Sequence, residues 1–280
     1  MTRRAAARLT TATAAALVLA ACSSSGGSSP SSSATPSGSE SDGMYMPSQT
    51  ATSTAAPTQQ VAPAPVDTNN ATATQGAIAT ATPPSGIAGL LAWNTGDYPG
   101  PGKPGSTALS HDHVPGPVVY SVMPPVGGQH SPVWLNAGVY TVPVPSERAV
   151  HDMEHGAVWI TYDPSLPADK VAVLTSFVAK QSLIAETGQG MPDGQANRYV
   201  VMSPWPSAGL PSPIVISSWG YQLRVTDPSD PRLQQFVDTF RHSEQYSPEY
   251  GPPVDGVPTG TGGVAASNGA AKPNPDGVAG

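Results

Sequence analysis

The sequence of 280 residues has little charge and few aromatic side chains. Charged residues make up 11% of it and aromatic residues 6%, whereas a typical globular domain has about 25% charged residues. Glycine and proline are in excess instead, with 29 and 33 copies. Stretches of such composition bury too little apolar surface to offset the entropy lost when the chain is ordered. A compact fold over the whole chain is therefore excluded.

The chain also lacks an excess of positive charge. Its 12 lysines and arginines stand against 19 aspartates and glutamates, which gives a formal net charge of −7. Proteins that bind nucleic acid usually present a basic face to the phosphates, so no nucleic-acid partner is expected. An acidic chain is also not held at an anionic membrane by charge.

Cysteine occurs once, at Cys22, directly after an apolar N-terminal run. Three arginines precede this run, which covers residues 9–21. The run is too short to span a bilayer as a stable helix. The run ends in Leu-Ala-Ala-Cys, which resembles the lipoprotein box of bacteria, although an ordinary secretory signal is the alternative. We predict that residues 1–21 are a signal peptide, exported by the general or the twin-arginine route, and that Cys22 is lipidated, for example with palmitate. The chain would then be extracytoplasmic, anchored to the bacterial cell membrane through its lipid and without disulfides.

Composition divides the rest of the chain into three parts. Residues 22–88 are rich in Ser, Thr, Pro and Ala and predict a disordered linker without helix or strand. Residues 89–250 have the apolar patterning of a single globular domain. Residues 251–280 return to Gly, Pro and Ala and predict a disordered tail.

The globular part predicts an α+β fold, in which helices cover one mixed sheet. Apolar and β-branched runs indicate strands at 117–123, 157–162, 198–202, 214–218 and 221–225. Trp219-Gly220, between the last two, indicates a bulge or a tight bend. Helices are expected at 146–155, capped by Ser146 and ended by Gly156, at 168–186, and from Asp230-Pro231 onward.

All the histidines lie in this globular part: His111, His113, His130, His151, His155 and His242. Positions i, i+3 and i+4 of a helix share one face, so His151, Glu154 and His155 could converge on one point. Two imidazoles with a nearby carboxylate suit a zinc site. The spacing H-x-x-E-H also matches a metalloprotease pattern, in which Glu154 would be the catalytic base of a zinc-dependent hydrolase.

Further ligands are candidates from the loops. His130 follows Gly127-Gly128, which allow the backbone to bend and bring its side chain close, and His113 could be a fourth ligand. The bound ion would be zinc or copper. Alternatively, the histidines only brace the loops, and the domain is a structural or partner-binding module without metal. His242 and the segment His111-Asp112-His113 are expected at the surface.

Several motifs together resemble the domain-of-unknown-function 3105 family from about His111 to Glu249. They are His113-Val114, Tyr120, Pro124-Pro125-x-x-Gly128-x-His130, Gly138-x-Tyr140, Val150-His151-x-x-Glu154-His155-Gly156-x-Val158, Met202-Ser203-Pro204, Ser218-Trp219-Gly220 and Pro248-Glu249. The resemblance implies an exported or membrane-anchored bacterial protein and a fold, but no activity. It implies that the histidines and the glutamate of these motifs act together. The chain departs from the family in Val126-Gly127, where members tend to have Thr-Ser, and in lacking the cysteines of some members, so no thiol chemistry is expected.

These observations predict a cell-envelope lipoprotein with a metal or small-ligand site of His and Glu residues. A module without metal and a zinc-dependent hydrolase remain as alternatives.

Overall fold

A computed structural model describes most of residues 66–250. Within this range it leaves out residues 85, 97, 99, 101–106, 182–184, 187–194 and 197–198, and outside it describes residue 63 and the short strands at 59–60, 266–267 and 270–271. The predicted signal peptide, Cys22, and most of the predicted linker and tail lie outside the described residues. Within the described part of the chain, no helix is long and apolar enough to cross a membrane.

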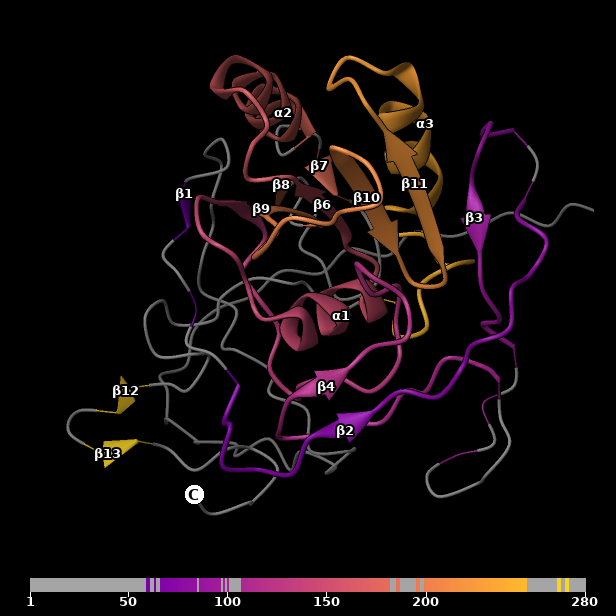
Figure 1. The fold of residues 1–280 in the computed structure, drawn as a ribbon, viewed down its shortest axis with the longest axis vertical. Helices are drawn as coiled ribbons and strands as arrows, with labels where there is room; N and C mark the ends of the chain where they lie inside the picture. Colours follow the sequence, from indigo (N-terminus) through magenta and orange to yellow (C-terminus); the bar gives the residue numbers. More distant parts are fainter. Residues whose placement is uncertain are drawn as a thin grey trace, which may run out of the picture. The chain divides into compact units, whose positions relative to one another are not determined.

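A mixed sheet of seven strands forms the centre of the described domain (Figure 1). Strands β1, β5, β9 and β6 run parallel to one another, and β10, β11 and β3 extend the sheet with antiparallel pairing. In order across the sheet, the strands are β1 (Gln59–Gln60), β5 (Gly138–Tyr140), β9 (Val200–Pro204), β6 (Val158–Tyr162), β10 (Ile214–Ser218), β11 (Tyr221–Val225) and β3 (Leu91–Ala92). Three small pairs accompany it: β2 (Ala73–Thr74) with β4 (Val118–Val119), β7 (Ala185–Glu186) with β8 (Gln195–Ala196), and β12 (Ala266–Ser267) with β13 (Ala270–Ala271).

Helices cover both faces of this sheet. In Figure 1, α2 (Ala168–Gln181) and α3 (Pro231–Phe240) lie on one side and α1 (Ser146–Glu154) lies on the other. The central strands β6, β9 and β10 are buried at every position, as expected for strands that are covered on both faces. The predicted α+β class is confirmed.

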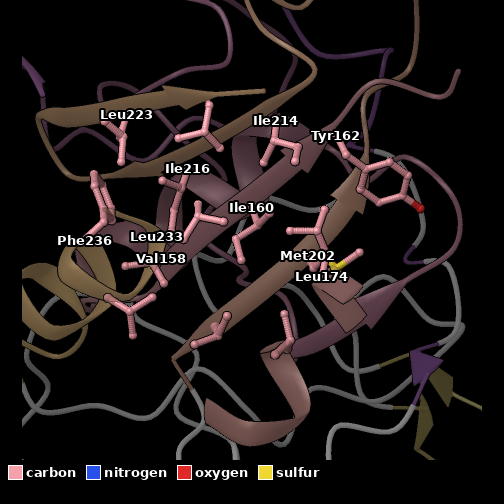
Figure 2. Close-up of a cluster of buried hydrophobic side chains, with 14 of the residues drawn as sticks. Val158, Ile160, Tyr162, Leu174, Met202, Ile214, Ile216, Leu223, Leu233 and Phe236 are labelled. Carbon is pink, nitrogen blue, oxygen red and sulfur yellow. The ribbon is translucent and has the colours of Figure 1, made fainter. Parts of the chain in front are cut away.

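The two larger of the three apolar cores in the described domain result from the alternation of side chains along the strands. Val158, Ile160 and Tyr162 of β6 pack with the buried residues of α2 and α3 in one core, which Figure 2 shows in close-up. Trp159, between them in sequence, points to the opposite face and packs with α1 and its flanking loops. The second core therefore supports the helix that carries the H-x-x-E-H motif.

The helix ends follow ordinary capping chemistry in part. Asp230 caps α3, because its Oδ1 accepts a hydrogen bond from the Arg232 N–H at 2.9 Å. The expectation that Ser146 caps α1 is wrong, since Ser146 is already the first helical residue, and Pro145 before it provides no side-chain cap. Helix α2 ends at Gln181, five residues before its predicted end.

Two short strands lie in the segment that was expected to be without structure. The expectation of no strand within residues 22–88 is wrong, because Gln59–Gln60 pair in parallel with β5 and Ala73–Thr74 pair in parallel with Val118–Val119. Gln75, the residue after β2, contacts another loop of the domain: its Nε2 donates a hydrogen bond of 2.8 Å to the carbonyl of Gly127. Trp219-Gly220 forms a tight bend, a two-residue connection between the paired residues that end β10 and begin β11.

Candidate metal centre

Helix α1 supplies two of the polar side chains that the sequence singles out. His151 and Glu154 are one turn apart and are both fully buried. Neighbouring residues fix the helix to the loops around it: Asp152 Oδ1 accepts the Leu135 N–H at 2.7 Å, and Glu147 Oε1 accepts the Val118 N–H at 2.9 Å. The helix is therefore held in a single orientation toward these loops.

Two loops bring His113 and His130 to the same place. The Val114 N–H donates to the His130 carbonyl at 2.7 Å, and the His130 N–H donates to the Asp112 carbonyl at 3.1 Å. These bonds form a parallel bridge that sets His113 beside His130. Gly127, with φ of 135°, permits the turn before His130, where a Cβ would lie 2.9 Å from a methyl carbon of Leu109.

Four donor groups converge where the helix and the loops meet. One ligand atom from each of His113, His130, His151 and Glu154 lies within 4.8 Å of all the others. Glu154 Oε2 is 2.8 Å from His130 Nε2 and 4.0 Å from His113 Nε2. The side chains of His130 and Glu154 have no solvent exposure, whereas that of His113 is 23% exposed. The cluster is thus buried on the helix side and reaches solvent at His113.

Backbone carbonyls fix the orientation of the rings. His130 Nδ1 lies 2.7 Å from the carbonyl oxygen of Gly128, and His151 Nδ1 lies 2.7 Å from that of Ser131. A carbonyl only accepts, so each Nδ1 carries a proton and donates it. In the neutral ring, each Nε2 then presents its lone pair. This arrangement is typical of metal-binding histidines, whose second nitrogen is held by a carbonyl or carboxylate.

The charges of the site also suit a cation. Burial raises the pKa of Glu154, but the adjacent His130 and the contact with His111 outweigh it, so this pKa lies well below its usual range. Burial lowers the pKa of His113, as does the neighbouring His130. Burial likewise puts the pKa of His151 well below its ordinary value. Burial opposes protonation of His130 as well, yet the Glu154 carboxylate raises the pKa of this residue. At neutral pH the site therefore offers an ionised Glu154 carboxylate and neutral imidazoles at His113 and His151, while the carboxylate favours the protonated form of His130.

His155 lies behind the cluster rather than within it. Its Nε2 is 2.8 Å from the Nε2 of His151, and the two rings stack with centroids 4.7 Å apart. Its Nδ1 lies 3.2 Å from the carbonyl oxygen of Glu249. Burial lowers the pKa of His155 to about 4, so this ring is also neutral at neutral pH.

A comparison with protein families identifies the family of the chain. The family described as "Protein of unknown function (DUF3105)" matches residues 111–256, more than half of the chain. The chain belongs to this family. The match confirms the resemblance seen in the motifs and contains all the donor residues described above. No curated protein and no solved structure matches the chain.

The structure brings together most of the site residues that the sequence predicts in this DUF3105 domain. His113, His130, His151 and Glu154 share the cluster, and His155 contacts it through His151. The predicted lipidation site, Cys22, lies outside the described residues. Spacing along α1 favoured His151 and His155 as the helical pair, but His151 and Glu154 are the pair that faces the two loops.

Two histidines of the DUF3105 domain differ from expectation. His111 contacts the site, since its Nδ1 lies 3.0 Å from Glu154 Oε1 and its ring is only 34% exposed. The proximity of His111 to His113 in the sequence was the available signal. The expectation that His242 is a surface residue is wrong: it is buried, and its ring stacks on Tyr199 and Tyr250.

Proposed function

We propose that this chain binds a divalent transition-metal ion through His113, His130, His151 and Glu154. The observation that carries the proposal is the convergence of the four ligand atoms within 4.8 Å. Metal–nitrogen and metal–oxygen bonds are about 2.0–2.2 Å long, so an ion can reach all four donors after small shifts of the side chains. Imidazole nitrogens suit zinc, copper, iron and nickel.

Hydrogen-bond geometry supports a bound ion over a purely structural cluster. His130 Nε2 and Glu154 Oε2 are partnered only by each other, in an ion pair of 2.8 Å whose angles depart from those of an ordinary hydrogen bond. His113 Nε2 is buried without a hydrogen-bond partner in this part of the chain. Buried polar atoms normally have partners, and a bracing role for the histidines would provide them. A metal ion satisfies all three atoms at once.

The position of Glu154 favours a role as ligand over a role as catalytic base. A hydrolytic base faces a metal-bound water, whereas one oxygen of Glu154 faces His111 and the other faces His130. We therefore propose metal binding, without a hydrolytic step, as the function that the geometry supports best.

Metal-dependent stabilisation tests this proposal. The full chain would carry Cys22→Ser, so that neither a lipid nor a thiolate interferes, and would be purified without a polyhistidine tag. At a free Zn²⁺ or Cu²⁺ concentration of about 100 times Kd, binding stabilises the folded state by about 2.7 kcal/mol. For a domain of this size, the melting temperature should rise by about 5–10 °C.

Matched variants locate the effect. His113→Ala removes the most exposed of the four ligands and should lose most of the thermal shift, whereas His242→Asn changes a histidine outside the cluster and should keep it. No shift with either ion, together with substoichiometric metal in elemental analysis, would overturn the proposal. An equal shift in His113→Ala and in the parent would place the metal elsewhere.

We also propose that the protein acts at the outer surface of the cell membrane, held there by a lipid on Cys22. The support comes from the sequence around this cysteine. Cys22→Ser should move the protein from the membrane fraction to the soluble extracytoplasmic fraction. Retention of the variant in the membrane fraction would refute lipid anchoring at this residue.

A further inference from the structure

We propose that His111 is a positioning residue of the metal site: it holds one carboxylate oxygen of Glu154, so that the other oxygen is presented to the ion. This inference rests on the proposed metal-binding function and concerns a histidine that is not one of the four donors. Its starting point is the side chain of Glu154, whose two oxygens have different neighbours.

The two carboxylate oxygens of Glu154 face opposite ways. Oε1 lies 3.0 Å from His111 Nδ1, in the one hydrogen bond of ordinary geometry that this side chain makes within the described residues. Oε2 lies 2.8 Å from His130 Nε2 and 4.0 Å from His113 Nε2, on the side of the other donors. The carboxylate therefore turns Oε2 toward the cluster while Oε1 is held by His111.

The backbone explains why His111 and His113 meet the same carboxylate. Residues two apart along a strand-like segment point to the same side, and the parallel bridge at His113 gives the segment such a backbone. Asp112, between the two histidines, turns to the hydroxyl of Tyr98 instead, which donates a hydrogen bond to its Oδ2. One short segment thus supplies both a ligand and the residue that orients another ligand.

A buried indole fixes the ring of His111 against Glu154. The ring centroids of His111 and Trp219 are 4.9 Å apart, and Trp219 is fully buried. This indole is itself confined, because a Cβ on Gly127 would lie 3.1 Å from one of its ring carbons. The imidazole of His111 is therefore held from behind, although its other side reaches solvent.

The hydrogen bond at Oε1 controls the direction of Oε2. The terminal torsion of a glutamate is broad, so a carboxylate without partners rotates easily about it. The Glu154 side chain has no solvent exposure, so without His111 its Oε1 would be a buried acceptor with no partner, which is costly. Replacing the outer partner of a metal ligand typically lowers metal affinity about 10–100-fold.

The test measures Zn²⁺ affinity by competition with a chelating dye, on the full chain with Cys22→Ser. Two neutral amides at position 111 form a matched pair. The amide of His111→Asn takes the place of Nδ1 and can donate to Glu154 Oε1, whereas the longer side chain of His111→Gln places its amide near the former Nε2, away from this oxygen. His111→Gln should lower Zn²⁺ affinity about 10–100-fold, and His111→Asn should retain most of it.

A second background shows whether His111 acts through Glu154. In a chain that carries Glu154→Ala, the oxygen that His111 holds is gone, so adding His111→Gln should change Zn²⁺ affinity little further. A histidine that merely braced the loop would cause the same loss in both backgrounds, because effects of independent residues add.

The outcomes separate this inference from the proposed function. A parent chain that binds neither Zn²⁺ nor Cu²⁺ overturns the metal site itself. A parent chain that binds Zn²⁺ overturns only the role of His111 if His111→Gln binds equally well, if His111→Asn loses as much as His111→Gln, or if the loss persists in the Glu154→Ala background. Urea midpoints of the metal-free variants show that they are folded, and His111→Ala, which has no amide, replaces His111→Gln if the latter does not fold.

Discussion

Replacing Gly156 by alanine tests how α1, the helix that carries His151 and Glu154, is packed. Gly156 follows His155 directly and has a φ of 98°. A Cβ at this position would lie 2.5 Å from Ser247 Oγ and 3.0 Å from the Cα of His242. The second contact is with backbone, which cannot rotate away. The segment that carries His242 is also tied to Gly156, because the His242 N–H donates to the Gly156 carbonyl at 2.7 Å.

The expected loss of stability has two parts. An alanine forced to positive φ costs about 1–3 kcal/mol. Overpacking against neighbours that cannot retreat costs about 1–3 kcal/mol more. Gly209 supplies the matched control, because its φ is 111° but no atom lies within 4 Å of a Cβ built there. Gly209→Ala should therefore show the first part alone, and Gly156→Ala should show both.

Urea denaturation measures the difference. With a slope of about 1–3 kcal/mol per molar urea, the midpoint for Gly156→Ala should fall by roughly 1 M or more below that for Gly209→Ala. The metal-free protein is used for both variants, so that ion binding does not contribute. Equal midpoints for the two variants would refute the close approach of the C-terminal segment to the end of α1.

Three further predictions concern stability. Because the pKa of His155 is lowered to about 4 in the folded state, the unfolded state binds more protons below about pH 6.5. The free energy of unfolding of the metal-free chain should then fall on the order of 3 kcal/mol between about pH 6.5 and about pH 4; a flat urea midpoint over this range would contradict it. Asp230→Ala should destabilise the protein by about 1 kcal/mol in the same assay, since it removes the cap of α3, whereas Asp230→Asn retains a cap and should change much less. Ile216→Ala empties a fully buried position of β10 and should lose about 2–5 kcal/mol, against less than about 0.5 kcal/mol for Val173→Ala on the exposed side of α2; similar losses would contradict the assignment of the core.

The class of fold was predictable because strongly periodic segments keep their local preference in the folded chain. Strands β10 and β11 and the start of α3 at Asp230-Pro231 lie where the sequence places them. Short strands were not predictable: β5 has only three residues and begins with glycine, so its pairing with β9 is decided by tertiary contacts.

The candidate site was predictable in its residues but not in its arrangement. Helical spacing places His151, Glu154 and His155 on adjoining positions of one face, but it does not say which pair faces the loops. That choice depends on the bridge between His113 and His130, which joins segments through backbone hydrogen bonds and leaves no pattern in the spacing of side chains. The burial of His242 depends likewise on rings from distant segments.

The His and Glu cluster joins separate segments of a chain whose single cysteine is Cys22. His113, His130 and the pair on α1 belong to three segments that are separate in sequence, and an ion bound to all of them is a covalent-like cross-link between those segments. Unlike a disulfide, such an ion stabilises the fold by binding only the folded chain, so its free energy of binding adds directly to the free energy of folding. The supply of metal would then set the resistance of the domain to local opening and to proteases.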